Sequence, residues 1–355
     1  MAQTQRARLI YNPTSGKEIM KKNVAEVLDI LEGFGYETSA FQTTPEKDSA
    51  KNEATRAALA GFDLIIAAGG DGTINEVVNG IAPLDKRPRL AIIPTGTTND
   101  YARALKVPRA NPIAAAKLIG KNQTVMMDIG QVRNHKNGQA QEVYFINIAA
   151  AGTLTELTYS VPSQLKTTFG YLAYVAKGAE LLPQVQFKPV RVEHDNGVFE
   201  DKVSMIFVAL TNSIGGFEQI VPDAKLDDGL FTLIMVKTGN LFDVIHLIRQ
   251  VLDGGKHINS NKIEYIKTKR IHIEEVKKGA KSLMINLDGE YGGDAPVEFI
   301  NLNNHIEFIA DTDLVADEAI TLTEEDVEPI RFEMAHKFVE EVDHLDEISD
   351  SQVAE

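Results

Sequence analysis

The chain has 355 residues, of which 43% are hydrophobic and 25% are charged, a composition typical of a soluble globular protein long enough for two domains. It contains no Cys, which excludes disulfides, thiol nucleophiles and cysteine metal clusters. The net charge of −15 is uneven, because residues 311–355 hold 16 acidic and 2 basic side chains while the nearly neutral remainder, with 35 and 34, lacks the basic character of a nucleic-acid-binding protein.

The first 128 residues alternate between the apolar patterns of strands and helices. The predicted order is strand 7–11, helix 24–34, strand 36–43, helix 45–61, strand 63–68, helix 73–81 and strand 89–94. The second of these helices is expected to begin at Pro45, a favoured first helical residue. Such alternation predicts a Rossmann-like α/β domain, with a parallel sheet and ligands at the carboxyl ends of its strands.

From about Thr124 onward, strand patterns dominate. The predicted strands are 124–132, 142–150, 190–195, 203–210, 230–236, 269–276, 282–290 and 296–302. The turn Asp195–Gly197 (DNG) predicts a hairpin between two of them. Helical patterns are confined to Gln164–Leu182 and Leu241–Leu252. These residues therefore predict a β-rich second domain, most simply a sandwich.

The end of the chain differs from both parts. Residues 331–355 are acidic and favour a solvated extension, although RFEMAHKFVEEV (331–342) has the spacing of a docked helix as an alternative. No apolar run approaches the ~18–20 residues needed to span a bilayer, and the first residues lack the apolar core of a signal peptide. A cytoplasmic protein is expected.

A glycine-rich loop, GGDGTINEVVNG (69–80), directly follows a predicted strand. It lacks the spacing of a Walker A loop, and Asn75 stands where a Rossmann fingerprint needs its third glycine. The carboxylate of Asp71 would be repelled by phosphates unless a cation lay between them, and Mg²⁺ bridges carboxylates to nucleotide phosphates. The alternative is a tight turn in which Asp71 only caps the following helix.

Two further polar loops follow predicted strands. PTGTTNDYARAL (94–105) combines small hydrogen-bond donors with a second carboxylate, Asp100, and NPTSG (12–16) follows the first strand. The carboxyl ends of neighbouring parallel strands meet at one edge of a sheet. The three loops together therefore indicate a nucleotide site that can hold a metal.

With these motifs in order, followed by PDAKLDDG (222–229) and LDGEYGG (287–293), residues 6–310 resemble the bacterial diacylglycerol kinases, whose catalytic domain is shared with sphingosine and ceramide kinases. GGDGT alone is not specific, since NAD kinases carry it too. The resemblance implies an α/β nucleotide-binding domain over 1–128, a β-sandwich lipid-substrate domain over 129–304, and a return of residues 305–330 to the first domain.

The resemblance also implies roles for individual residues. The ATP contacts would be Asn12, Pro13, Thr14, Ser15, Gly16, Thr43, Gly70, Asp71, Gly72, Thr73, Ile74, Asn75, Glu76 and Thr97. Asp71 would hold the active-site Mg²⁺, with Asp100 in the same network, and Glu290 would be the general base. A second, structural Mg²⁺ would be bound by Asp228 and the carbonyls of Lys225 and Leu230. Without the resemblance, DGE and LDDG are ordinary turn sequences.

The expected function is therefore an ATP- and Mg²⁺-dependent kinase acting on diacylglycerol or a similar lipid alcohol, with no nucleic-acid partner. It would work transiently at the inner membrane surface, where Gln164–Leu182 could line a lipid entrance or form a core helix. A homodimer is left open. The alternatives are an NAD kinase, a kinase of a sphingoid or polyprenol lipid, and a non-catalytic nucleotide or lipid sensor.

Overall fold

A computed structural model describes residues 4–16, 18–96, 99–109, 111–136, 138–152, 187–212, 221–238, 243, 246–247, 250, 255–276 and 282–316. Four predicted features lie wholly or largely outside these residues: Thr97, the patterns Gln164–Leu182 and Leu241–Leu252, and the acidic segment 331–355.

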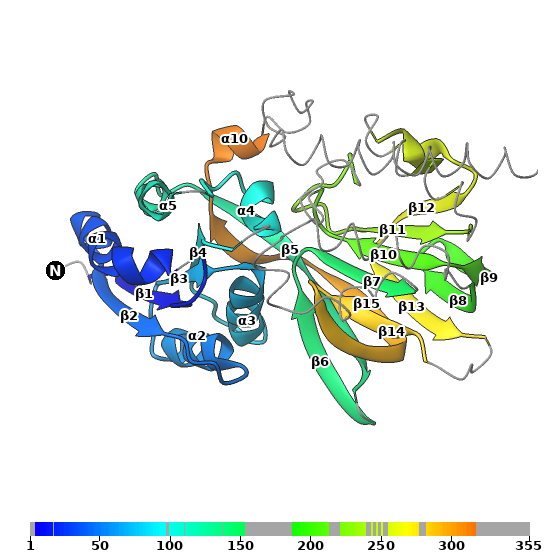
Figure 1. Ribbon diagram of the computed structural model, residues 1–355, viewed down its shortest axis with the longest axis horizontal. Helices are drawn as coiled ribbons and strands as arrows, with labels where there is room; N and C mark the ends of the chain where they lie inside the picture. The colour runs from blue at the N-terminus through cyan, green and yellow to red at the C-terminus, as the bar shows by residue number, and fades with distance from the viewer. Residues whose placement is uncertain are drawn as a thin grey trace, which may run out of the picture.

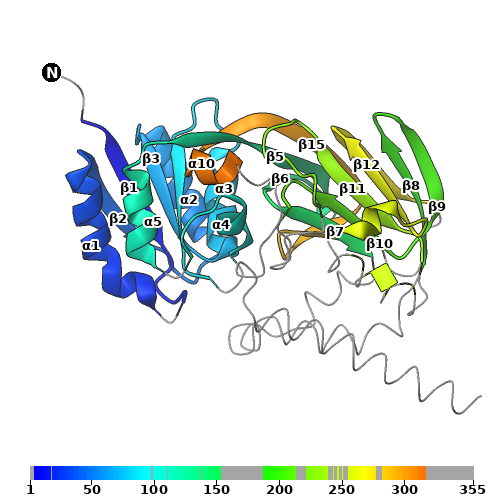
Figure 2. The same cartoon turned by 90° about the horizontal axis from the view of Figure 1, so that it is seen from above.

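The first part of the chain is the expected α/β layer. Its elements are β1 (Arg6–Tyr11), α1 (Ile19–Gly33), β2 (Glu37–Gln42), α2 (Ser49–Leu59), β3 (Leu64–Gly69), α3 (Asp71–Ile81), β4 (Arg89–Pro94), α4 (Asp100–Ala104) and α5 (Pro112–Ile119). The strands run parallel in the order β4-β3-β1-β2. Helices α1 and α5 cover one face of this sheet and α2 and α3 cover the other (Figures 1 and 2).

Four helices of this layer differ from the sequence prediction: α1 begins at Ile19 rather than near residue 24, α4 was not predicted, and α2 and α5 differ as follows. Helix α2 begins at Ser49 rather than Pro45, since the N–H of Ala50 donates to Glu76 Oε2 (2.9 Å) and the Ser49 hydroxyl accepts from the N–H of Thr44 (3.0 Å). Helix α5 was not predicted. Asn111 caps it by accepting from the N–H groups of its first turn, and Pro112 occupies the first position.

The second part is the expected β-rich structure. Its elements are β5 (Thr124–Lys136), β6 (Gln139–Phe145), β7 (Ile148–Gly152), β8 (Lys188–His194), β9 (Gly197–Val203), β10 (Met205–Ala209), β11 (Phe231–Val236), η2 (Lys256–Asn259), β12 (Ile263–Thr268), β13 (Arg270–Glu275), β14 (Met284–Leu287), β15 (Glu290–Ile309) and α10 (Thr312–Ala316). One run of strands is β12-β11-β10-β7-β14-β15, and the other joins β9, β8, β13 and then β15, with β5 and β6 beyond it. The two runs share β15 and enclose one apolar core, as in a sandwich.

Three strand predictions need correction. The run 142–150 is two strands, because the N–H groups of Ile146 and Asn147 leave the ladder to bind Asp288. The Asp195–Gly197 turn does form a hairpin, but its second strand is β9, and the run predicted over 203–210 is the separate strand β10. Strand β12 was not predicted at all.

Strands β5 and β15 join the two parts. They pair antiparallel along their lengths and pass from one layer into the other, as Figure 2 shows. At its far end β15 pairs parallel with β4 through Phe308 and Leu90, so the chain does return to the first sheet. The boundaries at residues 128 and 304 stay predictions, since both strands cross them.

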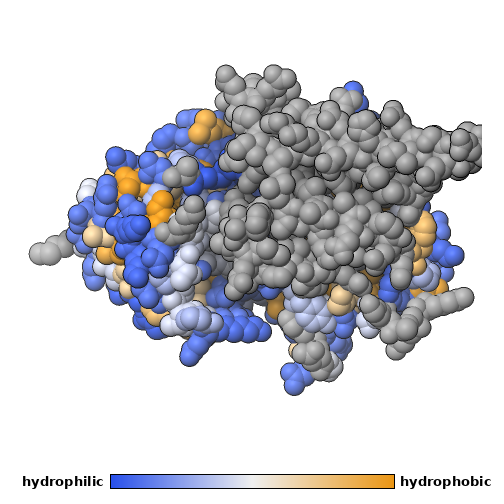
Figure 3. Space-filling model, viewed as in Figure 1, coloured by the Kyte–Doolittle hydropathy of each residue, from blue (hydrophilic) through white to orange (hydrophobic). Residues whose placement is uncertain are grey.

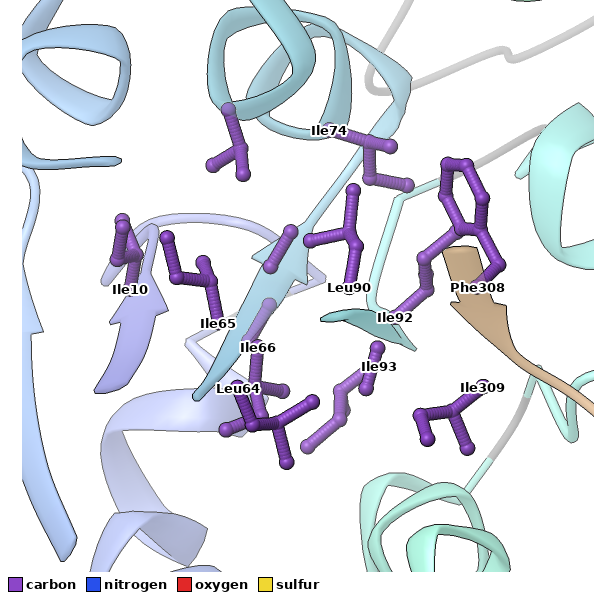
Figure 4. Close-up of a cluster of buried hydrophobic side chains, with 14 of the residues drawn as sticks. Ile10, Leu64, Ile65, Ile66, Ile74, Leu90, Ile92, Ile93, Phe308 and Ile309 are labelled. Atoms are coloured by element: carbon purple, nitrogen blue, oxygen red, sulfur yellow. The ribbon is translucent and has the colours of Figure 1, made fainter. Parts of the chain in front are cut away.

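The core of the α/β layer is built from the four short strands. Every residue of β3 is buried, and its isoleucines pack beside those of β1 and β4 (Figure 4). Phe308 and Ile309, from the end of β15, complete the same cluster. The exterior of this layer in Figure 3 is mainly hydrophilic, with small separate apolar spots. The described residues contain no helix that is long and apolar enough to cross a membrane.

Candidate active site

Three predicted loops converge at the carboxyl edge of the parallel sheet. Ser15, after β1, donates its hydroxyl to the carbonyl of Thr95, after β4 (3.0 Å). The N–H of Thr95 in turn donates to the carbonyl of Gly69, at the end of β3 (2.8 Å). Each loop is therefore fixed by a bond to a neighbour, and the three form one continuous backbone surface at this edge.

Glycines permit this close approach. A Cβ added to Gly96 would lie 2.6 Å from the Cα of Gly70, so these two loops touch backbone to backbone. Gly16 adopts φ +57°, and a Cβ there would lie 2.4 Å from the Thr95 carbonyl oxygen. Larger residues would separate the loops. Gly70 also precedes the first turn of α3, where the helix dipole favours an anion.

The two predicted carboxylates lie in this cluster. Asp71 is the first residue of α3, and its Oδ2 accepts from the backbone N–H of Asn99 (3.0 Å). Asp100 directly follows Asn99 in the chain, begins α4 and is buried. Asn99 adopts φ 50° and holds this turn by exchanging side-chain bonds with the N–H and carbonyl of Gly96. Asp71 and Asp100 are thus joined through one short turn.

The other predicted nucleotide contacts lie in the first loop, just after β2 and in the first turns of α3. In the first loop, Asn12 Oδ1 accepts from both the N–H and the hydroxyl of Thr14, which fixes the Pro13 turn. Thr43 is buried, and its N–H donates to the carbonyl of Tyr11. A Cβ added at Gly72 would have no atom of a neighbouring element within 4 Å.

Three side chains of helix α3 pack against or bind other parts of the fold. Ile74 lies in the apolar core, so only its backbone faces the loops (Figure 4). Glu76 accepts from the first turn of α2, and the Asn75 amide donates to Asp288 Oδ2 (2.8 Å). The N–H of Thr73 donates to the carbonyl of Gly70, as in an ordinary helical start.

Glu290 lies just after a tight hairpin turn. Asp288 (φ 48°) and Gly289 (φ 93°) are the two central residues between β14 and β15, and positive φ at both defines a type I′ turn. Glu290 is the first residue of β15 and is exposed. Because Asn75 lies one helical turn after Asp71 and binds Asp288, this hairpin sits beside the glycine loops.

Asp288 is a site residue that sequence reasoning missed. Its carboxylate accepts from the N–H groups of Ile146, Asn147 and Ile148, at 2.8 to 2.9 Å, as well as from Asn75. Burial raises the pKa of Asp288, and these donors partly offset that effect. The signal in the sequence was the DGE motif itself, in which Asp288 stands two residues before the predicted base.

Tyr101, on α4, links the second glycine loop to the same place. It is buried and donates its hydroxyl to the carbonyl of Ile146 (2.5 Å). Burial raises the pKa of Tyr101 well above its usual range, and the negative charges of Asp288 and Asp71 add to the effect. Both carboxylates therefore lie within electrostatic reach of one phenol.

The KLDDG loop is held by a buried carboxylate that was not predicted, Asp128. Asp128 accepts from the N–H groups of Gly229 (2.6 Å) and Asn304 (2.8 Å) and from the amide of Asn303 (2.9 Å). Burial raises the pKa of Asp128, and these bonds oppose the rise. Asp228 itself is exposed, and one of its oxygens accepts from the N–H of Leu230 (3.0 Å).

Among the described residues, no group of three His, Asp or Glu side chains is arranged to hold a metal ion by itself. A cation at the glycine loops would therefore need oxygen ligands from water or a bound phosphate beside the Asp71 carboxylate. This is the coordination that Mg²⁺ usually takes in nucleotide sites.

Comparison with known proteins agrees with this arrangement. Residues 6–132 match the diacylglycerol kinase catalytic domain, and residues 151–310 match the YegS C-terminal NAD kinase beta sandwich-like domain. The chain is 52% identical over 305 residues to a diacylglycerol kinase of Bacillus subtilis, covering 86% of this chain and 96% of the relative. For a diacylglycerol kinase of Staphylococcus haemolyticus the identity is 47% over 312 residues, covering 88% and 90%.

A solved structure of a diacylglycerol kinase from Bacillus anthracis has the same two-part fold, with a TM-score of 0.65 and 27% identity over 88% of this chain and 99% of that one. The sequence and structural matches extend over both parts, including the glycine loops and the Glu290 hairpin. The chain belongs to the diacylglycerol kinase family.

Proposed function

We propose that this protein transfers the γ-phosphoryl group of ATP to the hydroxyl of diacylglycerol, giving phosphatidate and ADP. The observation that carries the proposal is the bond between Asn75 and Asp288, which brings the Glu290 hairpin to the glycine loops. Relatives of 46–52% identity bear the name diacylglycerol kinase, which favours this lipid over a sphingoid or polyprenol acceptor and over the NAD kinase alternative.

ATP would bind along the small residues of the three loops. The N–H groups of Thr73, Thr95 and Gly96 donate within the fold, so the loops at 12–16, 70–76 and 94–96 would contribute small side chains, and their glycines would let phosphate oxygens approach the chain closely. The side chains of Asn75 and Glu76 are bonded to other parts of the fold, so these two residues would support the loop rather than bind ATP. Thr43 and Thr97 remain proposed contacts.

The site also suits one Mg²⁺ ion. Asp71 lies where phosphates would bind and is joined to the buried Asp100 through the Asn99 turn, so two carboxylates lie close to the proposed phosphate site. Mg²⁺ bound through Asp71 would neutralise charge between carboxylate and phosphates. The residues of this chain would hold that ion and orient the phosphates relative to the acceptor.

Glu290 is proposed as the general base. Its carboxylate would take the proton of the lipid hydroxyl as the oxygen bonds to the γ-phosphorus and the bond from that phosphorus to the bridging oxygen of ADP breaks. Its exposure at the start of β15 leaves access for an acceptor. A sensor without catalysis would have no use for this base.

A second, structural Mg²⁺ is proposed at the KLDDG loop. The exposed Asp228 carboxylate and the backbone carbonyls of Lys225 and Leu230 supply the oxygen ligands that Mg²⁺ prefers. Asp128 fixes the shape of this loop through Gly229, so the ligand positions would be preorganised. The test is isothermal titration of Mg²⁺ into the wild type and an Asp228→Asn variant: one fewer bound ion in the variant supports the site.

The acceptor lies in a membrane, so we propose a cytoplasmic protein that works transiently at the inner membrane surface, either as a monomer or as a homodimer. The decisive experiment is incubation with labelled ATP and a panel of acceptors in detergent micelles, containing diacylglycerol, a sphingoid base, a polyprenol and NAD⁺. We expect label in phosphatidate. Preferential labelling of another acceptor would replace diacylglycerol, and label in none would overturn the kinase assignment.

The position of ATP has its own test at Gly72. A methyl group there has no atom of a neighbouring element within 4 Å and keeps helical geometry, so Gly72→Ala is expected to leave the melting temperature unchanged. If phosphates lie against this residue, the variant will bind ATP at least tenfold more weakly by calorimetry, about 1.4 kcal/mol. Unchanged ATP affinity would place the nucleotide elsewhere.

A further inference from the structure

We infer that Asp288 is a positioning residue for phosphoryl transfer, acting as a tether between the Glu290 hairpin and the two helices that follow the glycine loops. The inference rests on the proposed function and adds to it a residue that touches neither substrate. Asp288 acts together with Asn75, Asn79, Tyr101 and the segment 144–148, and these residues together are called the tether below.

The segment 144–148 is the common attachment point. The Asp288 carboxylate binds three of its backbone N–H groups, and the N–H of Asp288 donates back to the carbonyl of Ile148 (2.9 Å). The segment therefore leaves the strand ladder at the residues that bind this one carboxylate. It lies outside the glycine-rich motifs and outside the hairpin, but it is hydrogen-bonded to residues of each.

Helix α3 is fastened to this segment by Asn79. Its side-chain amide donates to the carbonyl of Tyr144 (2.8 Å) and accepts from the N–H of Tyr144 (2.9 Å). This buried side chain thus forms the two backbone bonds that a neighbouring strand would otherwise form. The same amide donates to the carbonyl of Asn75, whose own amide binds Asp288. Helix α3 lies directly against β6 as a result (Figure 1).

Helix α4 is fastened independently. Tyr101, next to Asp100 on α4, donates its hydroxyl to the carbonyl of Ile146. The segment is also held from the second part of the fold, where Thr211 donates its hydroxyl to the Asn147 side chain. Each helix that carries a predicted catalytic carboxylate at its start is thus bonded to the five residues that surround Asp288. A shift of the Glu290 hairpin relative to Asp71 would break several of these bonds at once.

The hairpin alone does not need the Asp288 carboxylate. A two-residue type I′ turn closes by its backbone geometry, and Asn-Gly closes it as readily as Asp-Gly. All four donors to the carboxylate come from outside the hairpin, and burying this group costs free energy that a solvated turn would avoid. The charge therefore serves the attachment of the hairpin to the rest of the site.

The test is Asp288→Asn, because Asn keeps the turn but places N–H groups opposite donors. We expect ATP affinity within about threefold of the wild type and kcat lower by roughly 10–100-fold, since a displacement of about 1 Å can cost 10²-fold. Hydrogen exchange at Ile146, Asn147 and Ile148 should accelerate in the variant, which reports the tether without any assay of activity.

The matched control is Asp195→Asn. Asp195 also accepts two backbone N–H bonds, from Lys269 and Arg270, together with the hydroxyl of Thr268, all within the second part of the fold. Asp195 is exposed, so its replacement should cost less stability, and kcat should stay within twofold of the wild type. If both variants lose kcat equally, or if Asp288→Asn accelerates exchange and leaves kcat unchanged, the positioning role is overturned.

Should Asp288→Asn not fold, Asn75→Ala removes one of the four bonds and takes its place. The tether then predicts a fall in kcat with ATP affinity preserved, while a weaker affinity with normal kcat would make Asn75 a nucleotide contact and contradict the inference. If the wild type phosphorylates no lipid, the proposed function fails by itself, and hydrogen exchange still decides whether Asp288 holds the segment.

Discussion

The two parts of the molecule contribute to the site in different ways. In the α/β layer, the neighbouring parallel strands β4, β3 and β1 end at the same edge of the sheet. The loops that follow them therefore meet without any further attachment. In the antiparallel part, strand ends alternate between two edges, and only the β14–β15 hairpin brings a predicted catalytic residue to the site. A parallel sheet gathers its loops by topology, whereas an antiparallel one needs a specific attachment.

The largest expected effect tests the proposed base, which the antiparallel part contributes. Glu290→Gln keeps the size of the side chain but cannot accept a proton, so kcat should fall by roughly 10²–10⁴ while ATP binding stays within a few-fold. Steady-state kinetics beside calorimetry measure both. Glu298→Gln, on the same strand and half-exposed, is the control. Near-normal kcat in Glu290→Gln would make Glu290 a turn residue and turn attention to Asp100.

Next comes the contribution of the parallel part. Asp71→Asn fits the same helix start but lacks the charge that would oppose Mg²⁺, so activity should fall by about 10²–10³ and the Mg²⁺ titration should move to higher concentration. Asp63→Asn is the control at the other end of β3, where Asp63 accepts from the N–H of Arg6. A wild-type Mg²⁺ curve with full activity would remove Asp71 from the metal site.

A smaller effect is expected from separating two loops of the parallel edge. In Gly96→Ala the new methyl group would lie 2.6 Å from the Gly70 Cα and would push the loops apart, with a loss of roughly 10–100-fold in kcat/KM for ATP. Gly33→Ala, at the end of α1, meets no atom and should be neutral. Wild-type kinetics for Gly96→Ala would show that the contact of these loops is not needed.

The smallest effect concerns the acidic segment 331–355, which lies outside the described residues. A chain ending at Glu328 loses the whole acidic segment 331–355 and should phosphorylate lipid in micelles as well as the full chain. It should also bind anionic vesicles more tightly, because the removed negative charges repel such a surface at low salt. A folded but inactive shortened chain would give this segment a catalytic role.

The sequence predicted the parallel part better than the antiparallel part, for the same topological reason. Apolar runs and the glycine loops after them were sufficient to place Asp71 and Asp100 together, because a parallel sheet leaves few alternatives. Family resemblance, rather than pattern, singled out Glu290. Asp288 and Asn79 could not be predicted, since their partners are backbone groups distant in sequence, and the interruption at Ile146 has no local signal.

The closure of the first sheet by β15 has a consequence for the order of synthesis. Strand β4 receives its second neighbour only when Phe308 has been made, so a nascent chain carries an open edge through the synthesis of the whole second part. A fragment ending near residue 128 should therefore aggregate, and exchange of halves between relatives would need two junctions, one before β5 and one inside β15. A peptide covering the end of β15, added during refolding, should rescue such a fragment.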